Sequence, residues 1–140
     1  SFDPVATAVL VGMMKQTLIS GTARSVRLNG FTHPAAGKTG TTSDYKDTWF
    51  AGFTPFMTTV VWVGYDNNTL TQLTGVSGSV PVWTQFMKKM ATQYPPEDFP
   101  GPEGTSRVTL DLATLQRLNA NLETENSQPV ELVFKRGTEP

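Results

Sequence analysis

The stretch Gly37-Lys38-Thr39-Gly40-Thr41-Thr42 decides how the rest of the chain is interpreted, because two unrelated structures use a Gly-Lys-Thr core. A phosphate-binding loop needs a glycine five residues before that core and a helix directly after it. Here the earlier position is Thr32, and a glycine and two β-branched threonines follow the core. Those residues disfavour a helix and favour a strand. We therefore interpret the stretch as a strand and not as a nucleotide-binding loop.

The side chains of this strand are expected to divide between its two faces. Lys38 and Gly40 point to one face of a regular strand, and Thr39 and Thr41 point to the other. Where such a strand borders a cleft, the glycine lets a substrate backbone approach and the threonine hydroxyls can bind a carboxylate. The lysine ammonium adds positive potential. The alternative is a plain edge strand with an exposed lysine.

An antiparallel sheet is predicted around this strand. Runs rich in threonine, valine and aromatic residues cover 36–42, 48–54 and 58–65. The breaks between them are polar or contain proline and are short enough for hairpins. In the third run apolar residues fall on both faces, so we expect that strand to be covered on both sides. Aromatic residues on strands usually pack, and the three tryptophans are interpreted in that way.

One helix is predicted before the sheet in the sequence, and a second helix is predicted after it. Asp3 followed directly by a proline starts a helix, and the apolar spacing predicts a buried helix over residues 4–19. Residues 22–34 lack periodicity and are predicted as a loop with room for one short strand. Ser79 can cap the second helix, which Pro95 ends. Its aromatic stripe is expected to pack on the sheet.

Three segments are predicted along the chain: a main body over 1–94, a linker over 95–105 and a small tail over 106–140. Proline and glycine dominate the linker. In the tail, alternating apolar residues predict two short strands around the leucine-spaced segment 115–122. Since the tail has few aromatics, we expect that it cannot fold alone and packs on the main body.

Composition excludes several functional classes. The chain has 140 residues, 38% of them apolar, which is typical of a globular protein. Eleven basic residues balance twelve acidic ones without a run of like charges, so no nucleic-acid partner is expected. With no cysteine and one histidine, His33, neither a disulfide nor a Cys/His zinc site can form, and no cofactor is expected. His33 itself is interpreted as a surface residue.

Four sequence blocks follow one another along the chain. They are Gly21-Thr22-Ala23, Ala36-Gly37-Lys38-Thr39-Gly40-Thr41-Thr42, Asp47-Thr48-Trp49-Phe50-Ala51-Gly52-Phe53-Thr54-Pro55 and Val61-Trp62-Val63-Gly64-Tyr65-Asp66. In this order and spacing they resemble the class A penicillin-binding proteins. Pro81-Val82-Trp83 resembles the last transpeptidase helix of that family, and Gly137-Thr138-Glu139-Pro140 resembles its C-terminal ending. The resemblance covers most of residues 4–94 closely and the tail loosely.

The resemblance implies an α+β fold of the β-lactamase/transpeptidase group, with an antiparallel sheet flanked by helices, of which this chain is a partial domain. It implies a serine-type D,D-transpeptidase that cross-links peptidoglycan stem peptides and is acylated by β-lactam antibiotics. Lys38 would then supply charge and proton handling. Thr39, Gly40 and Thr41 would bind the substrate and its carboxylate. The backbone N–H of Thr41 would complete the oxyanion hole.

The nucleophile is where the sequence departs from the family pattern. The motifs Ser-x-x-Lys and Ser-x-Asn are expected before the Lys-Thr-Gly strand, and neither precedes Lys38. The one Ser-x-x-Lys, Ser43-Asp44-Tyr45-Lys46, falls in a predicted hairpin turn and is interpreted as a turn. The expected partner is therefore the N-terminal part of the same domain, which carries the serine. This chain alone is expected to be inactive.

The resemblance also implies features that lie outside this sequence. These are a glycosyltransferase domain and a membrane anchor that holds the enzyme at the extracytoplasmic face of the bacterial cell membrane. No apolar run here approaches the ~20 residues of a spanning helix. Two alternatives stay open: a degenerate, non-catalytic member that acts as a binding module, and a D,D-carboxypeptidase or β-lactamase relative. Finding both serine motifs upstream in the gene would exclude the first.

Overall fold

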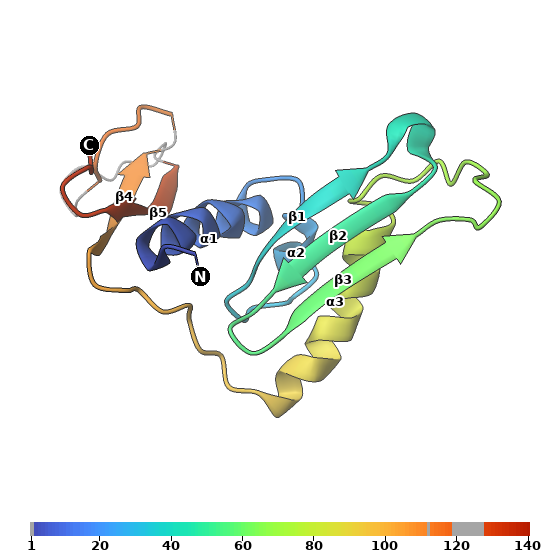
Figure 1. Cartoon of the computed structure of the whole chain (residues 1–140), viewed down its shortest axis with the longest axis horizontal. Coiled ribbons are helices and arrows are strands. Elements are labelled where there is room, and N and C mark those ends of the chain that lie inside the picture. Colours follow the sequence, from blue (N-terminus) through green and yellow to red (C-terminus); the bar gives the residue numbers. More distant parts are fainter. Residues whose placement is uncertain (1, 112, 119–127) are drawn as a thin grey trace. The chain divides into compact units, whose positions relative to one another are not determined.

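The computed structural model describes residues 2–111, 113–118 and 128–140 (Figure 1). The chain forms two compact units. One consists of Met14–Phe99, and the other of Ser1–Met13 together with Pro100–Pro140. The packing of the tail on the main body stays a prediction.

The larger unit is built on a three-stranded antiparallel sheet in the order β1-β2-β3, where β1 is Ala36–Thr41, β2 is Thr48–Phe53 and β3 is Thr58–Val63. This confirms the predicted meander and the α+β class. The predicted runs extend one or two residues beyond the observed strands, which is the usual uncertainty of element ends. A single 3-10 turn, η1 (Ser43–Tyr45), joins β1 to β2.

Helix α3 (Ser79–Met90) covers one face of the sheet, as predicted, but of its two aromatic residues Trp83 is buried and Phe86 is 43% exposed (Figure 1). Its fully buried Trp83 meets the rings of Phe31 and Phe50 edge-on, at centroid distances of 5.5 and 5.1 Å. The indole N–H donates to the carbonyl oxygens of Gly52 and Thr59, at 3.4 and 3.2 Å. A buried tryptophan is stable when its N–H is satisfied in this way. Trp83 therefore joins the helix to the sheet.

The start of α3 differs from the prediction. Gly78, and not Ser79, is the N-cap residue, and no side chain caps the helix. Ser79 is already the first helical residue, and its hydroxyl donates to the backbone oxygen of Gly75 at 3.3 Å. The short 3-10 turn η2 (Ala91–Gln93) follows α3 before the prolines.

The second face of the sheet is exposed, so the expectation that the third strand is covered on both sides is wrong for this chain. Val60, Trp62 and Trp49 are 55%, 42% and 43% exposed. Strand pairing aligns Lys38 with Ala51 and Val60, so the lysine lies on this same face. The sequence pattern identifies apolar side chains, but it cannot say whether this chain supplies the element that covers them.

Helix α1 (Pro4–Ile19) has the predicted bounds. The Asp3 carboxylate accepts a hydrogen bond from the Ala6 N–H at 2.8 Å, as expected of an N-cap. The helix is less buried than predicted, since Leu10 and Met13 are 56% and 61% exposed. The predicted loop over 22–34 contains a short helix, α2 (Ser25–Leu28), instead of a strand.

The smaller unit contains a two-stranded antiparallel sheet of β4 (Thr105–Asp111) and β5 (Pro129–Lys135), which confirms the two predicted strands. Val108, Leu110 and Val130 form its small core. The first part of α1 packs on β5, because a Cβ at Gly12 would lie 2.9 Å from a methyl group of Val133. Of the leucine-spaced segment 115–122, residues 119–122 lie outside the described residues.

The Asp111 carboxylate accepts backbone hydrogen bonds that stabilise the chain at the end of β4. Its Oδ1 accepts hydrogen bonds from the backbone N–H groups of Ala113 and Thr114, at 3.0 and 2.9 Å. Its Oδ2 accepts from the N–H of Gln128 at 2.9 Å, next to the start of β5. These donors, Gln128 foremost and then Thr114, lower the pKa of the carboxyl below its usual value.

Candidate functional site

Strand β1, which carries the Lys-Thr-Gly motif, forms an edge of its sheet. Within the described ranges no strand pairs with its second edge. Thr42 N donates to the Asp47 oxygen at 3.1 Å, so Thr42 directs its backbone groups toward β2. In an antiparallel strand successive residues direct their backbone N–H and C=O groups to opposite edges. The backbone groups of Gly37, Thr39 and Thr41 therefore point to the free edge. The Thr41 N–H is therefore placed to donate to a ligand.

Two neighbours already occupy part of this free edge. The Thr17 hydroxyl of α1 donates to the backbone oxygen of Gly37 at 2.7 Å. The Lys38 ammonium folds back and donates to the oxygen of Thr39 at 2.9 Å. Lys38 is exposed on the outer face. The open stretch of the edge therefore consists of the Thr39 N–H and the backbone groups of Thr41.

The two threonine hydroxyls of the motif each have one defined neighbour. The Thr39 Oγ1 lies 2.9 Å from the Thr22 Oγ1, and either atom can be the donor. The Thr41 Oγ1 accepts a hydrogen bond from the Gly75 N–H at 3.3 Å. Thr22 follows α1, and Gly75 belongs to the loop before α3. Two separate segments thus meet at the motif strand.

Gly40 leaves space on the outer face of the motif strand. Among the described residues, a Cβ built there would meet only the Trp49 Cβ, at 3.4 Å, which is an ordinary contact. A Cβ at Gly75 would lie 2.9 Å from the Thr39 Cβ, so that loop already touches the strand on the other face. The open side of the strand is therefore the side of Lys38.

The hairpin turn after the motif holds the formal Ser-x-x-Lys. Asp44 and Tyr45 have φ values of 62° and 55°, in the left-handed region, so Ser43 and Lys46 are not joined by a regular helical turn. The interpretation of this segment as a turn is confirmed. Next to it, the Asp47 carboxylate accepts a hydrogen bond from the Trp62 indole N–H at 3.0 Å, which ties the turn to β3.

In the part of the chain that the structure describes, no hydrogen bond joins a serine to Lys38. The buried Ser79 hydroxyl is engaged with the backbone of Gly75, away from the lysine. Nor do three or more histidine, aspartate or glutamate side chains of the described residues gather where they could hold a metal ion. Among the described residues, the motif strand therefore presents a positive charge and two hydroxyls, without a serine bonded to its lysine.

His33 differs from its prediction as a surface residue. It is half-buried, and its ring lies 5.8 Å from Phe31 and 6.4 Å from Phe56. Its backbone oxygen accepts a hydrogen bond from Arg27 at 2.7 Å. His33 therefore packs in an aromatic group beside α3 and is no part of the motif strand.

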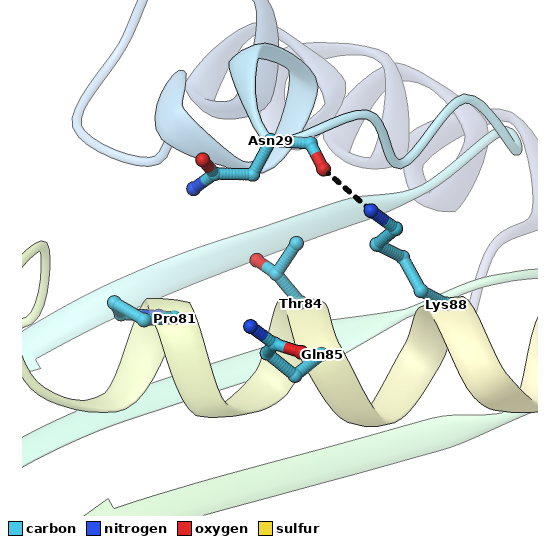
Figure 2. A pocket seen from close by; sticks show the side chains of 5 residues that line it. All are labelled: Asn29, Pro81, Thr84, Gln85 and Lys88. Atoms are coloured by element: carbon cyan, nitrogen blue, oxygen red, sulfur yellow. Dashed lines mark hydrogen bonds between the residues drawn. The ribbon is translucent and has the colours of Figure 1, made fainter.

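A cavity of about 460 Å³ lies between the end of α2 and helix α3 (Figure 2). Lys88 spans it and donates to the backbone oxygen of Asn29 at 2.9 Å. None of the motif residues lines this cavity. No helix among the described residues is long and apolar enough to cross a membrane.

Sequence reasoning missed the two residues that contact the motif hydroxyls. Thr22 stands 17 positions before its partner Thr39, and Gly75 stands 34 positions after Thr41. No periodicity connects residues at such separations. The only available signal was the position of Thr22 within the block Gly21-Thr22-Ala23.

Comparison with known proteins gives consistent matches. No protein-family model matches the chain. It is 38% identical over 136 residues to penicillin-binding protein 1A of Aquifex aeolicus, which covers 96% of this chain and 18% of that protein. It is 36% identical over 127 residues to penicillin-binding protein 1B of Vibrio cholerae, which covers 89% of this chain and 16% of that protein. The chain therefore spans less than a fifth of these curated relatives.

The fold also has a counterpart among solved structures. Penicillin-binding protein 1A from Haemophilus influenzae matches with a TM-score of 0.76 and 21% sequence identity. The match covers 99% of this chain and 21% of that chain. The likeness confirms the fold class expected from the sequence.

Proposed function

Because this chain belongs to the class A penicillin-binding proteins, as a part of their transpeptidase domain, we propose that it supplies the Lys-Thr-Gly strand of a peptidoglycan D,D-transpeptidase. In this reaction a serine attacks the penultimate D-alanine carbonyl of a stem peptide and releases the terminal D-alanine. The acyl-enzyme then passes the peptide to an amine of a neighbouring strand. A β-lactam acylates the same serine and stays attached.

The observation that carries this proposal is the free edge of β1. The Thr41 N–H points to that edge, where it can donate to the oxyanion that forms in the transition state. One such donor contributes about 3 kcal/mol to transition-state stabilisation. Thr39 and Thr41 offer hydroxyls for the substrate carboxylate, and Lys38 supplies the positive charge. Gly40 leaves the room that a bound peptide needs.

The serine is proposed to come from the N-terminal part of the same domain. Two features support this: the absence of a serine beside Lys38 among the described residues, and the exposed apolar face formed by Val60, Trp62 and Trp49. An exposed apolar patch of this kind is typical of an interaction surface. The glycosyltransferase domain, the membrane anchor and the extracytoplasmic location belong to this same proposal for the full-length protein.

A non-catalytic binding module is the second candidate, and the missing nucleophile is the observation that favours it. The two are separated by intact mass spectrometry of the full-length protein and of this chain alone, each with and without benzylpenicillin. The transpeptidase predicts that the full-length protein gains the mass of one penicillin and that this chain gains none. The matched control replaces the serine of the upstream Ser-x-x-Lys with alanine.

Each outcome of the mass measurement distinguishes between the candidate functions. No mass gain on the full-length protein would favour the non-catalytic module. A gain on this chain alone would mean that one of its own serines is the nucleophile, contrary to the proposal. Rapid release of the bound penicillin from the full-length protein would indicate a β-lactamase relative instead.

A further inference from the structure

The end of α1 and the turn that follows it each contact the free edge of β1 at one point. The Thr17 hydroxyl donates to the Gly37 oxygen at 2.7 Å, and the Thr22 hydroxyl lies 2.9 Å from the Thr39 hydroxyl. In a strand every second residue directs its backbone N–H and C=O groups to the same edge, so Gly37 and Thr39 are neighbours along the free edge of β1. The turn therefore borders the start of the open stretch of the edge.

The backbone of Thr22 has a defined place. Ala23 N, directly after it, donates to the Thr17 oxygen at 2.8 Å, and Gly21 N, directly before it, donates to the Gln16 oxygen at 3.0 Å. Ala23 is fully buried. A Cβ at Gly21 would lie 2.7 Å from the Thr17 Cα, so the turn is wound tightly against the helix end. The backbone position of Thr22 is thus set by the fold, and its hydroxyl contacts Thr39 from there.

The hydrogen bonds around Thr39 and Thr41 decide which hydroxyl protons stay available for a ligand. The Gly75 N–H donates to the Thr41 Oγ1, so the Thr41 proton is free to face a ligand. A hydroxyl has one proton and two lone pairs. When Thr22 donates to Thr39, Thr39 stands in the same state as Thr41: one lone pair is engaged and its proton is free. If Thr39 donated to Thr22 instead, its proton would not be available to a ligand.

We propose that Thr22 is a positioning residue that donates to Thr39 and so presents the Thr39 hydroxyl proton, beside that of Thr41, to the carboxylate of the bound substrate. This inference rests on the proposed function, in which these two threonines bind that carboxylate. Hydrogen bonds to a charged acceptor are the strong ones, and they gain from donors that are already oriented. Thr22 does not touch the substrate itself.

Replacing Thr22 with valine is expected to act on carboxylate ligands only. In the full-length protein, Thr22→Val should lower the rate constant for acylation by benzylpenicillin on the order of tenfold, the effect of one charge-assisted hydrogen bond. The reaction with the benzylpenicillin methyl ester, which lacks the charge, should change little relative to the wild type. Thr22→Ser keeps the hydroxyl and should restore the reaction.

The matched control is Thr92→Val, which removes a hydroxyl that donates to the Lys89 oxygen at 2.8 Å, outside the site. Thr22→Ala serves as the second variant if valine impairs folding, as judged by thermal unfolding. Equal losses with the acid and the ester, or no loss with either, would overturn the role of Thr22. A wild-type protein that penicillin does not acylate would instead refute the proposed function, and the inference would fail with it.

Discussion

Two glycines of the motif strand, three residues apart, are expected to respond to alanine in opposite ways. At Gly37 a Cβ would lie 2.7 Å from the Phe50 ring and 2.8 Å from the backbone oxygen of Ala51. That oxygen belongs to the neighbouring strand β2 and cannot move without disturbing the sheet. At Gly40 the nearest atom would be the Trp49 Cβ, at 3.4 Å. Gly37→Ala should therefore perturb the fold, and Gly40→Ala should perturb only the site.

The magnitudes follow from these contacts. Overpacking a core position costs roughly 1–3 kcal/mol, so Gly37→Ala should lower the stability of the domain by that amount. In a domain of 150–250 residues this corresponds to about 2–4 °C in Tm per kcal/mol. Gly40→Ala should change stability by less than about 0.5 kcal/mol, since it meets no clash and strands prefer alanine to glycine. Its methyl group would instead occupy the space proposed for the substrate backbone.

The assay combines thermal unfolding of the full-length protein with its rate of acylation by a fluorescent penicillin. Gly40→Ala should retain the wild-type Tm and lose about tenfold or more in acylation rate, which is about 1.4 kcal/mol. Gly37→Ala should lower the Tm. Wild-type acylation by Gly40→Ala would contradict the proposed approach of the substrate. A wild-type Tm for Gly37→Ala would contradict the packing of β1 on Phe50.

Two further predictions concern the cores of the two units. Trp83→Ala should destabilise the larger unit by roughly 3–5 kcal/mol, because it removes a fully buried ring, and Trp83→Phe should cost less; denaturant unfolding measures both. Since the folded pKa of Asp111 is lowered, its contribution to stability is present above the usual carboxyl pKa of about 4 and is lost as the pH falls through the folded pKa. Acid titration of β5 amide signals by NMR should show this loss, and Asp111→Asn should flatten it; an unchanged titration in that variant would contradict the assignment.

Local patterns predicted most of the fold. The start of α1 could be predicted because an N-cap oxygen and a proline act within one turn of the helix, and Asp3 does cap it. The three strands could be predicted because their composition and their short breaks are local. Strand alternation alone placed Lys38 and Thr39 on opposite faces, and the pairing register agrees.

Contacts between distant segments could not be predicted. The four residues of α2 are too few to establish a helical period, so that segment was predicted as a loop. The N-cap of α3 was misplaced because the Ser79 hydroxyl bonds to Gly75 within the chain turn before the helix. The Thr22 and Thr39 hydroxyls meet only because the end of α1 packs on β1, a tertiary contact that no spacing encodes.

The exposed sheet face and the incomplete site are two consequences of one arrangement. Lys38 pairs with Ala51, and Ala51 pairs with Val60, so the Lys38 side chain lies on the same face as the exposed valine. That face also carries Trp62, which is 42% exposed. The Lys38 ammonium donates to the Thr39 oxygen at the free edge of β1, so a serine that meets it would be carried by an element that lies where this face reaches that edge. The proposed N-terminal part of the domain would then shield the apolar residues from water and deliver the nucleophile through the same contact. The proposed function therefore predicts that folding stability and penicillin reactivity are coupled in the full-length protein.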